Sequence, residues 1–360
     1  MRVLVLGGSG YVGARLCALL HASGWATPVS ASSRANGHGA LRVDTRDEEA
    51  LTTVLQQVDA VINCVAGSAD AITRGAAALT AAARKADFPR LVHLSSMAVY
   101  GAREGVLDEY TPLDGHGGWY ARAKVEAEAR MTELAADGAS VTLLRPGCVW
   151  GPGSQLWVGR VARWLAARRL GDLGEAGDGW SNLVHVDDVC HAALLALRVP
   201  AHPAEPRIYN LAAPDSPRWN DYFADLALAI GATPLRRIRS QQLKLDAYLA
   251  GPPLHVARKL LAKAGRPVDG VPEPITPGLL ALWRRHLLLD STAASEKLGL
   301  QWMDYNATLR QSAAWILSDD TLPLQARLAR SERTGRIGAQ QRVAPAQGAD
   351  VGGAHGEKDT

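Results

Sequence analysis

The sequence has few cysteines and no long apolar run, and both features limit the class of protein to which it can belong. No apolar stretch reaches the length of a membrane span, and the chain enters a predicted strand at once, without a signal peptide. No Cys-x-x-Cys pair is present, so we expect reduced thiols rather than a disulfide framework. These features predict a cytoplasmic protein with no membrane partner. The four cysteines are Cys17, Cys64, Cys148 and Cys190.

Metal-ligand spacing and strong charge are also missing. The ten histidines show no spacing typical of a metal site, so we expect no metal. Net charge is only +3 over 360 residues, with no basic block ahead of the tail, so we expect no nucleic-acid partner. Residues 328–360 are rich in Arg, Gly, Ala and Gln and contain few large apolar residues, which predicts a disordered tail.

A glycine-rich segment follows the first predicted strand. Residues 2–6 are an apolar run typical of a buried parallel strand, and residues 12–20 have helical periodicity. Glycines between such elements allow a tight turn and a close approach of the backbone to a pyrophosphate, while the helix N-terminus offers N–H donors. The segment predicts a dinucleotide cradle, with an ordinary glycine-rich turn as the alternative. Its residues are Gly7, Gly10, Tyr11, Val12 and Gly13.

Acidic residues are absent ahead of Asp44. Folds specific for NAD place Asp or Glu about 20 residues past the glycines, where it binds the ribose 2′-hydroxyl. Here the second predicted strand, 26–32, is followed by Ser33 and Arg34. A guanidinium binds a 2′-phosphate bidentately, whereas a carboxylate repels it. Arg34, with Arg15 of the first helix able to approach the same phosphate, favours NADP(H) over NAD(H); a solvated loop charge is the alternative.

Later strands supply the rest of the predicted cofactor site. Ligands of such sheets lie at the carboxyl ends of the strands. A third predicted strand at 41–44 therefore brings Asp44 and Thr45 near the adenine. A fourth, with its exit loop at 60–67, brings Ala66 and Gly67 close to the cofactor.

A serine, a tyrosine and a lysine form the candidate catalytic set. Ser96 lies just past a fifth predicted strand, 90–94, and Tyr120 and Lys124 are four residues apart in a helix-forming stretch, hence on one helix face. We expect Tyr120 to exchange a proton with the substrate oxygen while Ser96 hydrogen-bonds that oxygen. An isolated phenol has a pKa of about 10, too high for an efficient base at neutral pH. We expect Lys124 to hold the nicotinamide ribose and to lower this pKa.

The pair alone is a weak signal, because eight tyrosines and seven lysines allow chance pairs. Tyr120 is, however, the only tyrosine with a lysine four residues later, and it comes 24 residues after Ser96. The order of cradle, serine and Tyr/Lys pair favours a functional interpretation.

Over about residues 1–320 the chain resembles the extended short-chain dehydrogenase/reductase family, the branch of sugar-nucleotide epimerases, dehydratases and steroid or dihydroflavonol-type reductases. The resemblance implies an α/β fold: a Rossmann-type doubly wound parallel sheet with a smaller, mainly C-terminal substrate lobe. It identifies Ser96 rather than Ser95 as the catalytic serine and implies a homodimer through the Tyr120 helix. It is carried by the segments 7–13, 95–101, Tyr120 with Lys124, 144–153 and 183–189.

The resemblance also extends the site. We expect Ser95, Pro146 and Cys148 beside the cofactor, and the remaining site residues, Met97, Trp150 and Asn182, near the substrate.

Two departures from the family bear on the reaction. Dehydratases of this branch carry an Asp-Glu pair where this chain has Met97-Ala98, neither of which can act as acid or base. Nucleotide-sugar enzymes often have an arginine for the substrate diphosphate where Ser181 stands, and its absence forfeits a contact of about 1.5–3 kcal/mol. Dehydration is thus disfavoured, and epimerisation less strongly so.

Tryptophan is concentrated in the second part of the chain. Of ten tryptophans only Trp25 precedes residue 119, and Trp157 and Trp164 are seven residues apart on one predicted helix face. They form either a pocket wall for a hydrophobic or aromatic ligand or, as we favour, an ordinary packed core.

The motif order predicts a dinucleotide-binding domain from 1–148 plus 182–200 and a substrate lobe from 149–181 plus 201–322. We expect lobe helices at 220–230 and 293–298, chain breaks at Gly251-Pro252-Pro253 and 271–277, and a cover over the pocket from 240–280. The predicted function is an NADP(H)-dependent carbonyl reductase or alcohol dehydrogenase acting on a small molecule. The alternatives are an epimerase of the same fold and a catalytically silent NADP-binding regulator.

Overall fold

A parallel sheet of seven strands forms the centre of the protein in the computed structural model, which describes residues 1–33, 40–87, 89–200, 204–266, 268 and 271–318. Arg34 and the predicted tail lie outside the described residues. The strand order is β10-β7-β5-β4-β1-β2-β3. The strands are β1 (Arg2–Leu6), β2 (Thr27–Ser32), β3 (Leu41–Arg42), β4 (Ala60–Asn63), β5 (Arg90–Leu94), β7 (Val141–Pro146) and β10 (Arg207–Leu211).

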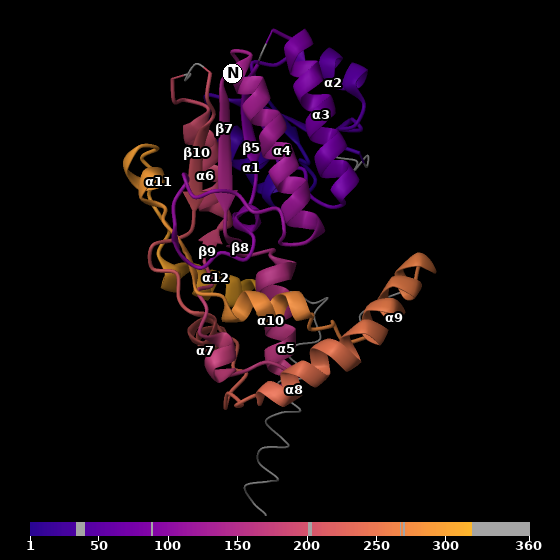
Figure 1. Ribbon diagram of the computed structural model, residues 1–360, viewed down its shortest axis with the longest axis vertical. Helices are drawn as coiled ribbons and strands as arrows, with labels where there is room; N and C mark the ends of the chain where they lie inside the picture. The colour runs from indigo at the N-terminus through magenta and orange to yellow at the C-terminus, as the bar shows by residue number, and fades with distance from the viewer. Residues whose placement is uncertain (34–39, 88, 201–203, 267, 269–270, 319–360) are drawn as a thin grey trace, which may run out of the picture.

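Helices cover both faces of this sheet, because successive apolar residues of each strand point to opposite sides. In β1, Val3 and Val5 pack toward α1 and α6, whereas Leu4 and Leu6 pack toward α2, α3 and α4. Figure 1 shows α4 crossing in front of β5 and β7. The helices are α1 (Tyr11–Ala22), α2 (Glu48–Leu55), α3 (Ala69–Lys85), α4 (Trp119–Ala136) and α6 (Val186–Ala196).

The order of the strands reverses between β1 and β4: β2 and β3 extend the sheet one way, and β4, β5, β7 and β10 the other. Such a reversal leaves a crevice at the carboxyl ends of the central strands, where ligands bind in sheets of this type. The predicted Rossmann-type doubly wound sheet is therefore confirmed.

The chain leaves and re-enters this domain through two small parallel sheets. The first pairs β8 (Cys148–Trp150) with β9 (Leu183–His185), and the second pairs β6 (Gly105–Leu107) with β11 (Leu287–Leu289). The segment 182–200 thus returns through β9 and α6 rather than through a strand of the large sheet. The edge strand β10 lies beyond it at 207–211, so a domain boundary at residue 200 is too early.

Among the described residues, seven further helices and four short helical turns lie outside the helices that cover the large sheet. The expected helices at 220–230 and 293–298 correspond to α7 and α11. The helices are α5 (Arg160–Ala166), α7 (Trp219–Ala229), α8 (Ser240–Leu245), α9 (Gly251–Lys263), α10 (Pro277–Arg284), α11 (Thr292–Glu296) and α12 (Tyr305–Ser318). The shorter turns are two 3₁₀ turns (Met97–Tyr100, Gly174–Gly177) and two π turns (Gln155–Gly159, Asp246–Ala250).

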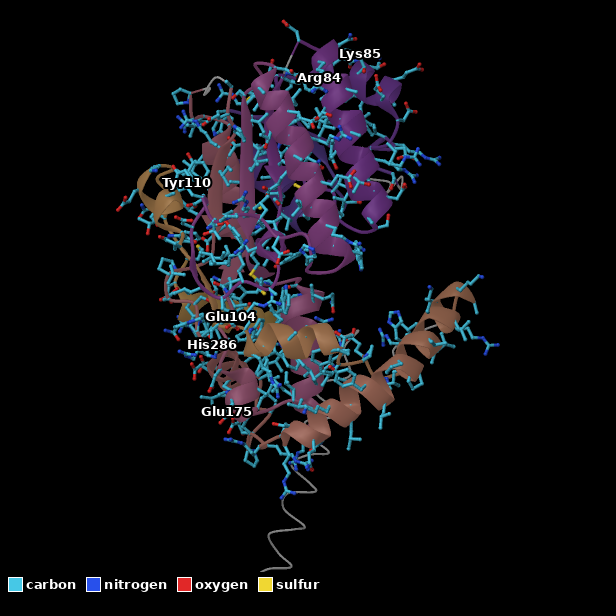
Figure 2. All side chains as sticks on the ribbon, viewed as in Figure 1. Arg84, Lys85, Glu104, Tyr110, Glu175 and His286 are labelled. Atoms are coloured by element: carbon cyan, nitrogen blue, oxygen red, sulfur yellow. The ribbon has the colours of Figure 1, made fainter. Side chains whose placement is uncertain are left out.

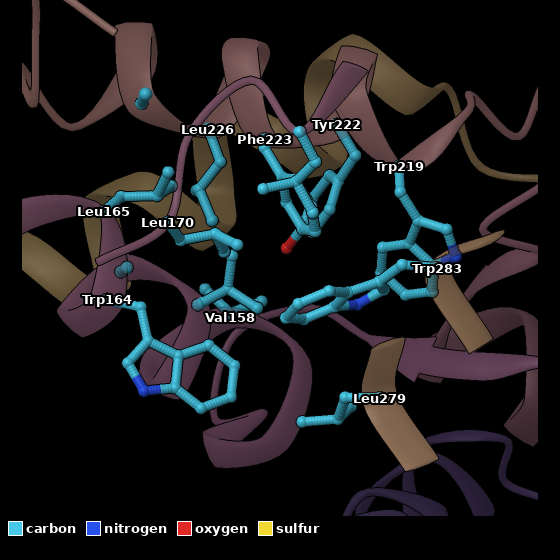
Figure 3. Packing of buried hydrophobic residues seen from close by; sticks show 14 of the residues in the cluster. Val158, Trp164, Leu165, Leu170, Trp219, Tyr222, Phe223, Leu226, Leu279 and Trp283 are labelled. Atoms are coloured by element: carbon cyan, nitrogen blue, oxygen red, sulfur yellow. The ribbon is translucent and has the colours of Figure 1, made fainter. Parts of the chain in front are cut away.

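The lobe has its own aromatic core, seen in Figure 3. Trp164 packs edge-on against Trp283, and Trp157 lies against Trp219, with ring centroids 6.1 and 5.4 Å apart. Trp164, Trp219 and Trp283 are almost fully buried. Of the two interpretations of the tryptophans, the packed core agrees with these contacts.

The prediction of a chain break at Gly251-Pro252-Pro253 was wrong. These residues begin α9 and follow the π turn without interruption, so residues 240–263 form a nearly continuous helical rod. Proline is tolerated in the first turn of a helix, because the N–H groups there need no partner within that helix. Among the described residues, no helix combines the length and apolarity needed to cross a bilayer.

Candidate active site

The glycine loop joins β1 to α1 at the switch point of the sheet. Gly7 has a φ of +80°, which L-residues with a side chain rarely adopt, and a Cβ at Gly13 would overlap the carbonyl oxygen of Gly7. The backbone N–H groups of Gly7 and Gly8 donate to Ala31 O, which fixes the loop against β2. Gly10 caps α1 without a side chain, so the N–H groups of the first turn face the cleft as an anion site.

A cleft of about 550 Å³ runs from this loop along the carboxyl ends of the strands. The buried hydroxyl of Ser95 lies at this cleft without a hydrogen-bond partner among the described residues, as expected where a ligand supplies one. The glycine-rich loop between β1 and α1 and the hydroxyl of Ser95 both fit a bound dinucleotide. Predicted cofactor residues that line the cleft are Gly7, Gly10, Tyr11, Val12, Gly13, Asp44, Thr45, Ala66, Ser95, Tyr120, Lys124 and Pro146.

The adenosine end of the cleft contains an ion-pair network that the sequence analysis missed. Arg46 donates to both carboxylate oxygens of Asp44, at 3.0 and 2.8 Å, and to Asp70 at 2.9 Å. These bonds lower the pKa of Asp44 to about 2. The position of Arg46, two residues past Asp44 at the end of a strand, could have revealed it.

Neutral hydroxyls stand where an NAD-specific fold has its acid. Ser32 ends β2 and lies 2.8 Å from the hydroxyl of Ser9, and both Ser32 and Ser33 line the cleft. Arg15, expected to approach a 2′-phosphate, instead forms a bidentate ion pair with Asp187 at 2.6 and 2.8 Å.

The three candidate catalytic side chains lie together at the nicotinamide end. Ser96 ends the loop after β5, and its hydroxyl accepts from the N–H of Ala98 at 3.2 Å. The hydroxyl of Ser96 is near enough to the Tyr120 phenol to lower its pKa. The Nζ of Lys124 lies 6.0 Å from the centroid of the Tyr120 ring. The three side chains singled out by position and spacing are therefore neighbours in the fold.

Lys124 is almost completely buried, and its ammonium is held by backbone carbonyls. Its Nζ donates to Leu94 O at 2.7 Å and to Val65 O at 3.3 Å. An ammonium has three donors, so these two bonds leave one for a ligand in the cleft. Burial lowers the pKa of Lys124 to about 8, opposed by the nearby Cys64 and Glu128.

The expected lowering of the phenol's pKa was wrong for this structure. Burial raises the pKa of Tyr120 above its usual value of 10.0, and the nearby Ser96 hydroxyl opposes this only in part. Two of the three donors of Lys124 are bound to backbone carbonyls, and Lys124 is not among the groups that lower the pKa of the phenol. At neutral pH Tyr120 is accordingly a protonated phenol, suited to donating a proton.

Several predicted site residues do not line the cleft. Cys148 and Trp150 are buried in the lobe core, where Trp150 contacts Tyr222 and Tyr305. Asn182 is buried and spans to β11, donating to Leu287 O and accepting from Leu289 N. The remaining three are Ser96, which is half-buried, Gly67, which is exposed, and Met97, which is half-buried and packs between two apolar clusters.

No described residue between 240 and 280 lines this cleft. Within the same described part of the chain, no group of three or more His, Cys, Asp or Glu side chains is arranged to hold a metal ion.

Residues 3–212 match the model of the NAD dependent epimerase/dehydratase family. Protein YeeZ of Escherichia coli (strain K12) is 28% identical over 262 residues, 65% of this chain and 86% of its own length. The 2-alkyl-3-oxoalkanoate reductase of Stenotrophomonas maltophilia (strain K279a) is 35% identical over 217 residues, 54% of this chain and 63% of that enzyme.

Solved structures agree on the fold. The dTDP-glucose 4,6-dehydratase of Streptomyces venezuelae, with NAD bound, superposes with a TM-score of 0.68 over 90% of this chain and 100% of its own. At 19% identity this likeness concerns the fold alone. Fold and site together define an enzyme of the extended short-chain dehydrogenase/reductase type, an NAD(P)-binding oxidoreductase. The chain belongs to the NAD dependent epimerase/dehydratase family.

Proposed function

We propose that the protein is an NADPH-dependent reductase of a carbonyl group on a small, hydrophobic substrate. The observation that carries this proposal is the grouping of the neighbouring hydroxyls of Ser96 and Tyr120 with the buried ammonium of Lys124. Its raised pKa keeps the phenol of Tyr120 protonated, which suits a group that gives a proton to a carbonyl oxygen. The reductase relative from Stenotrophomonas is consistent with this direction.

The chemistry of the chain's own residues follows from these contacts. The Ser96 oxygen accepts from Ala98 N–H, so its own proton is available to hydrogen-bond the substrate oxygen. Tyr120 donates its proton to that oxygen as the carbonyl becomes an alcohol. Lys124 uses its remaining donor to orient the nicotinamide ribose. A bound nicotinamide cofactor supplies the hydride.

The cofactor preference rests on the end of β2. With neutral Ser32 and Ser33 at the cleft, no carboxylate stands there to repel a 2′-phosphate. This supports NADP(H) over NAD(H).

A nucleotide-sugar epimerase is less well supported. Ser181, at the position where related enzymes often have an arginine for the diphosphate, is fully buried. Its hydroxyl is bound to the carbonyl of Pro217 and to the hydroxyl of Ser216. Ser181 therefore offers a diphosphate neither a positive charge nor an unbound hydroxyl.

The test is the substitution Tyr120→Phe, which removes the proton donor and keeps the ring. We expect turnover of a panel of ketones and aldehydes with NADPH to fall by about 10²–10⁴-fold, while NADPH affinity measured by fluorescence stays unchanged. Tyr110→Phe, at an exposed tyrosine seen near the left edge of Figure 2, is the matched control and should behave as wild type. An active Tyr120→Phe enzyme would refute the assignment.

A further inference from the structure

A helical rod extends from the lobe to one side of the molecule. It consists of α8, the π turn and α9, and Figure 1 shows α9 standing apart from the other helices. Its base is anchored in the lobe core by the buried side chains of Leu243 and Ala247, and by the ion pair of Asp246 with Arg169 at 2.6 Å. We call residues 236–266 the arm.

Apolar side chains are exposed along the arm. Each of five large ones is more than half exposed, although such side chains are usually covered in a folded protein. The apolar stripe continues along α9 at the helical spacing of Val256 and Leu260, four residues apart. The five exposed side chains are Leu245, Tyr248, Leu249, Val256 and Leu260.

The arm is also strongly basic. It carries eight basic residues and a single acidic one, Asp246, in a chain whose net charge is only +3. Within the described residues only Arg237 and Arg258 of the eight have an acidic partner, Asp172 and Glu273 respectively. The other six are Arg236, Arg239, Lys244, Lys259, Lys263 and Arg266, all exposed.

Charge and apolar surface share one face of α9. Lys259 and Lys263 each come three residues after Val256 and Leu260, so they flank the apolar stripe on the same side. Lysines in this position can lie with their stems along apolar surface and their ammonium groups in a polar layer. A helix with leucine or valine on one face and lysine at its border is typical of helices that lie in a membrane interface.

We propose that the arm binds the surface of an anionic lipid bilayer, with Val256 and Leu260 entering the acyl boundary and Lys259 and Lys263 contacting acidic headgroups. Such peripheral contact needs no spanning helix, and it does not depend on the reductase assignment. A second copy of this chain fits the face less well. A twofold interface opposes each patch to itself, which would bring the arm's excess positive charge against the same charge.

The test is flotation of the full chain with vesicles of phosphatidylcholine alone and of an equimolar mixture with phosphatidylglycerol. We expect binding to the anionic vesicles, weakened by salt, and little binding to phosphatidylcholine. Lys259→Gln with Lys263→Gln should weaken binding about thirtyfold. Val256→Ser with Leu260→Ser should weaken it by more than about tenfold.

The matched control is Lys85→Gln with Lys297→Gln, two exposed lysines outside the arm; Lys85 is labelled at the top of Figure 2. This double variant should bind like wild type, and every variant should keep the wild-type melting temperature. The proposal is overturned by a wild-type chain that ignores anionic vesicles, or by a control that weakens binding as much as the arm variants. Arm-dependent self-association in light scattering, or binding to polyglutamate in place of vesicles, would assign the face to a second copy or to an acidic protein.

Discussion

Lys124 shows how one residue can serve a site at a cost to the fold. Its ammonium is buried, and the carbonyls of Leu94 and Val65 hold it. Burial disfavours the charged form, so the pKa of Lys124 falls to about 8. A lysine in water titrates at about 10.4. The difference makes the free energy of unfolding depend on pH through this single side chain.

The first prediction concerns this dependence, measured without cofactor. Between pH 8 and about 10.4 the unfolded chain binds more protons at Lys124 than the folded chain, so the contribution of Lys124 to stability rises with pH. Urea unfolding of wild type and Lys124→Met should diverge across this range, wild type gaining about 3 kcal/mol relative to the variant. A difference between the two proteins that stays flat with pH would mean that Lys124 titrates normally.

A close contact with the backbone of Gly7 requires glycine at position 13. The variant Gly13→Ala would push its methyl group into the carbonyl of Gly7 and displace the start of α1 from the loop. We expect NADPH affinity to fall by at least about tenfold, since the helix N-terminus would lose its alignment with the pyrophosphate.

Gly278→Ala, in the first turn of α10, is the matched control, because a Cβ there meets nothing nearer than 3.9 Å. Titration of both variants with NADPH, followed by fluorescence, checks the prediction. Equal affinities of the two variants would contradict the role given to Gly13.

A buried ion pair fixes the helix that carries Tyr120 and Lys124. Arg145 of β7 binds both oxygens of Glu128 on α4, at 3.0 and 2.7 Å, and both side chains are 3% exposed. The same guanidinium donates to the hydroxyl of Tyr100, four residues past Ser96. The strand β7, the helix α4 and the turn after β5 are therefore joined at one buried charge pair.

Glu128→Gln should destabilise the protein by about 3–5 kcal/mol, because it leaves the charge of Arg145 buried without a partner. The double variant Glu128→Leu with Arg145→Met should recover most of this loss, since it removes both charges. Chemical denaturation of the three proteins measures the effect. If the double variant were no more stable than Glu128→Gln, the cost would lie elsewhere than in the unpaired charge.

Elements whose sequence pattern is local were predicted well. The glycine loop, the strands at 2–6 and 90–94, and the helix bearing Tyr120 depend on neighbouring residues, and the structure has each of them. The edge strand β10 was missed because its pairing with β7 joins residues some 65 positions apart. The chain break expected at Pro252 was wrong, because the sequence does not reveal that a π turn carries the rod straight into α9.

The candidate site was likewise predictable where its residues depend on local sequence, and not where they depend on contacts across the whole fold. Ser96, Tyr120 and Lys124 could be predicted because each has a fixed place on a strand end or a helix face. The burial of Tyr120, which reverses its expected pKa shift, depends on how the whole fold closes around it. The basic arm was missed for a similar reason. The net charge of the whole chain is small because the positive charge of the arm is largely offset by the net negative charge of the other residues.

At the scale of the whole molecule, the cofactor should stabilise the fold by mass action. NADPH at about 100 times its dissociation constant adds about 2.7 kcal/mol, which for a chain of this size raises the melting temperature by about 4 °C. NADH at the same concentration should raise it less, because neutral serines replace the acid that would bind its ribose. Differential scanning fluorimetry makes the comparison, and a larger shift with NADH would overturn the NADP preference while leaving the reductase proposal intact.

The pairing of β8 with β9 has a consequence for how such a molecule can change. These strands hold the two ends of the segment 151–182 at neighbouring positions, about 4.8 Å apart in a paired sheet. A segment whose two ends are held side by side can be lengthened, shortened or exchanged, because the entropic cost of closing a loop grows only slowly with its length. The segment between β8 and β9 can therefore vary in length and sequence while the large sheet, with Ser96 after β5 and Tyr120 on α4, keeps its structure.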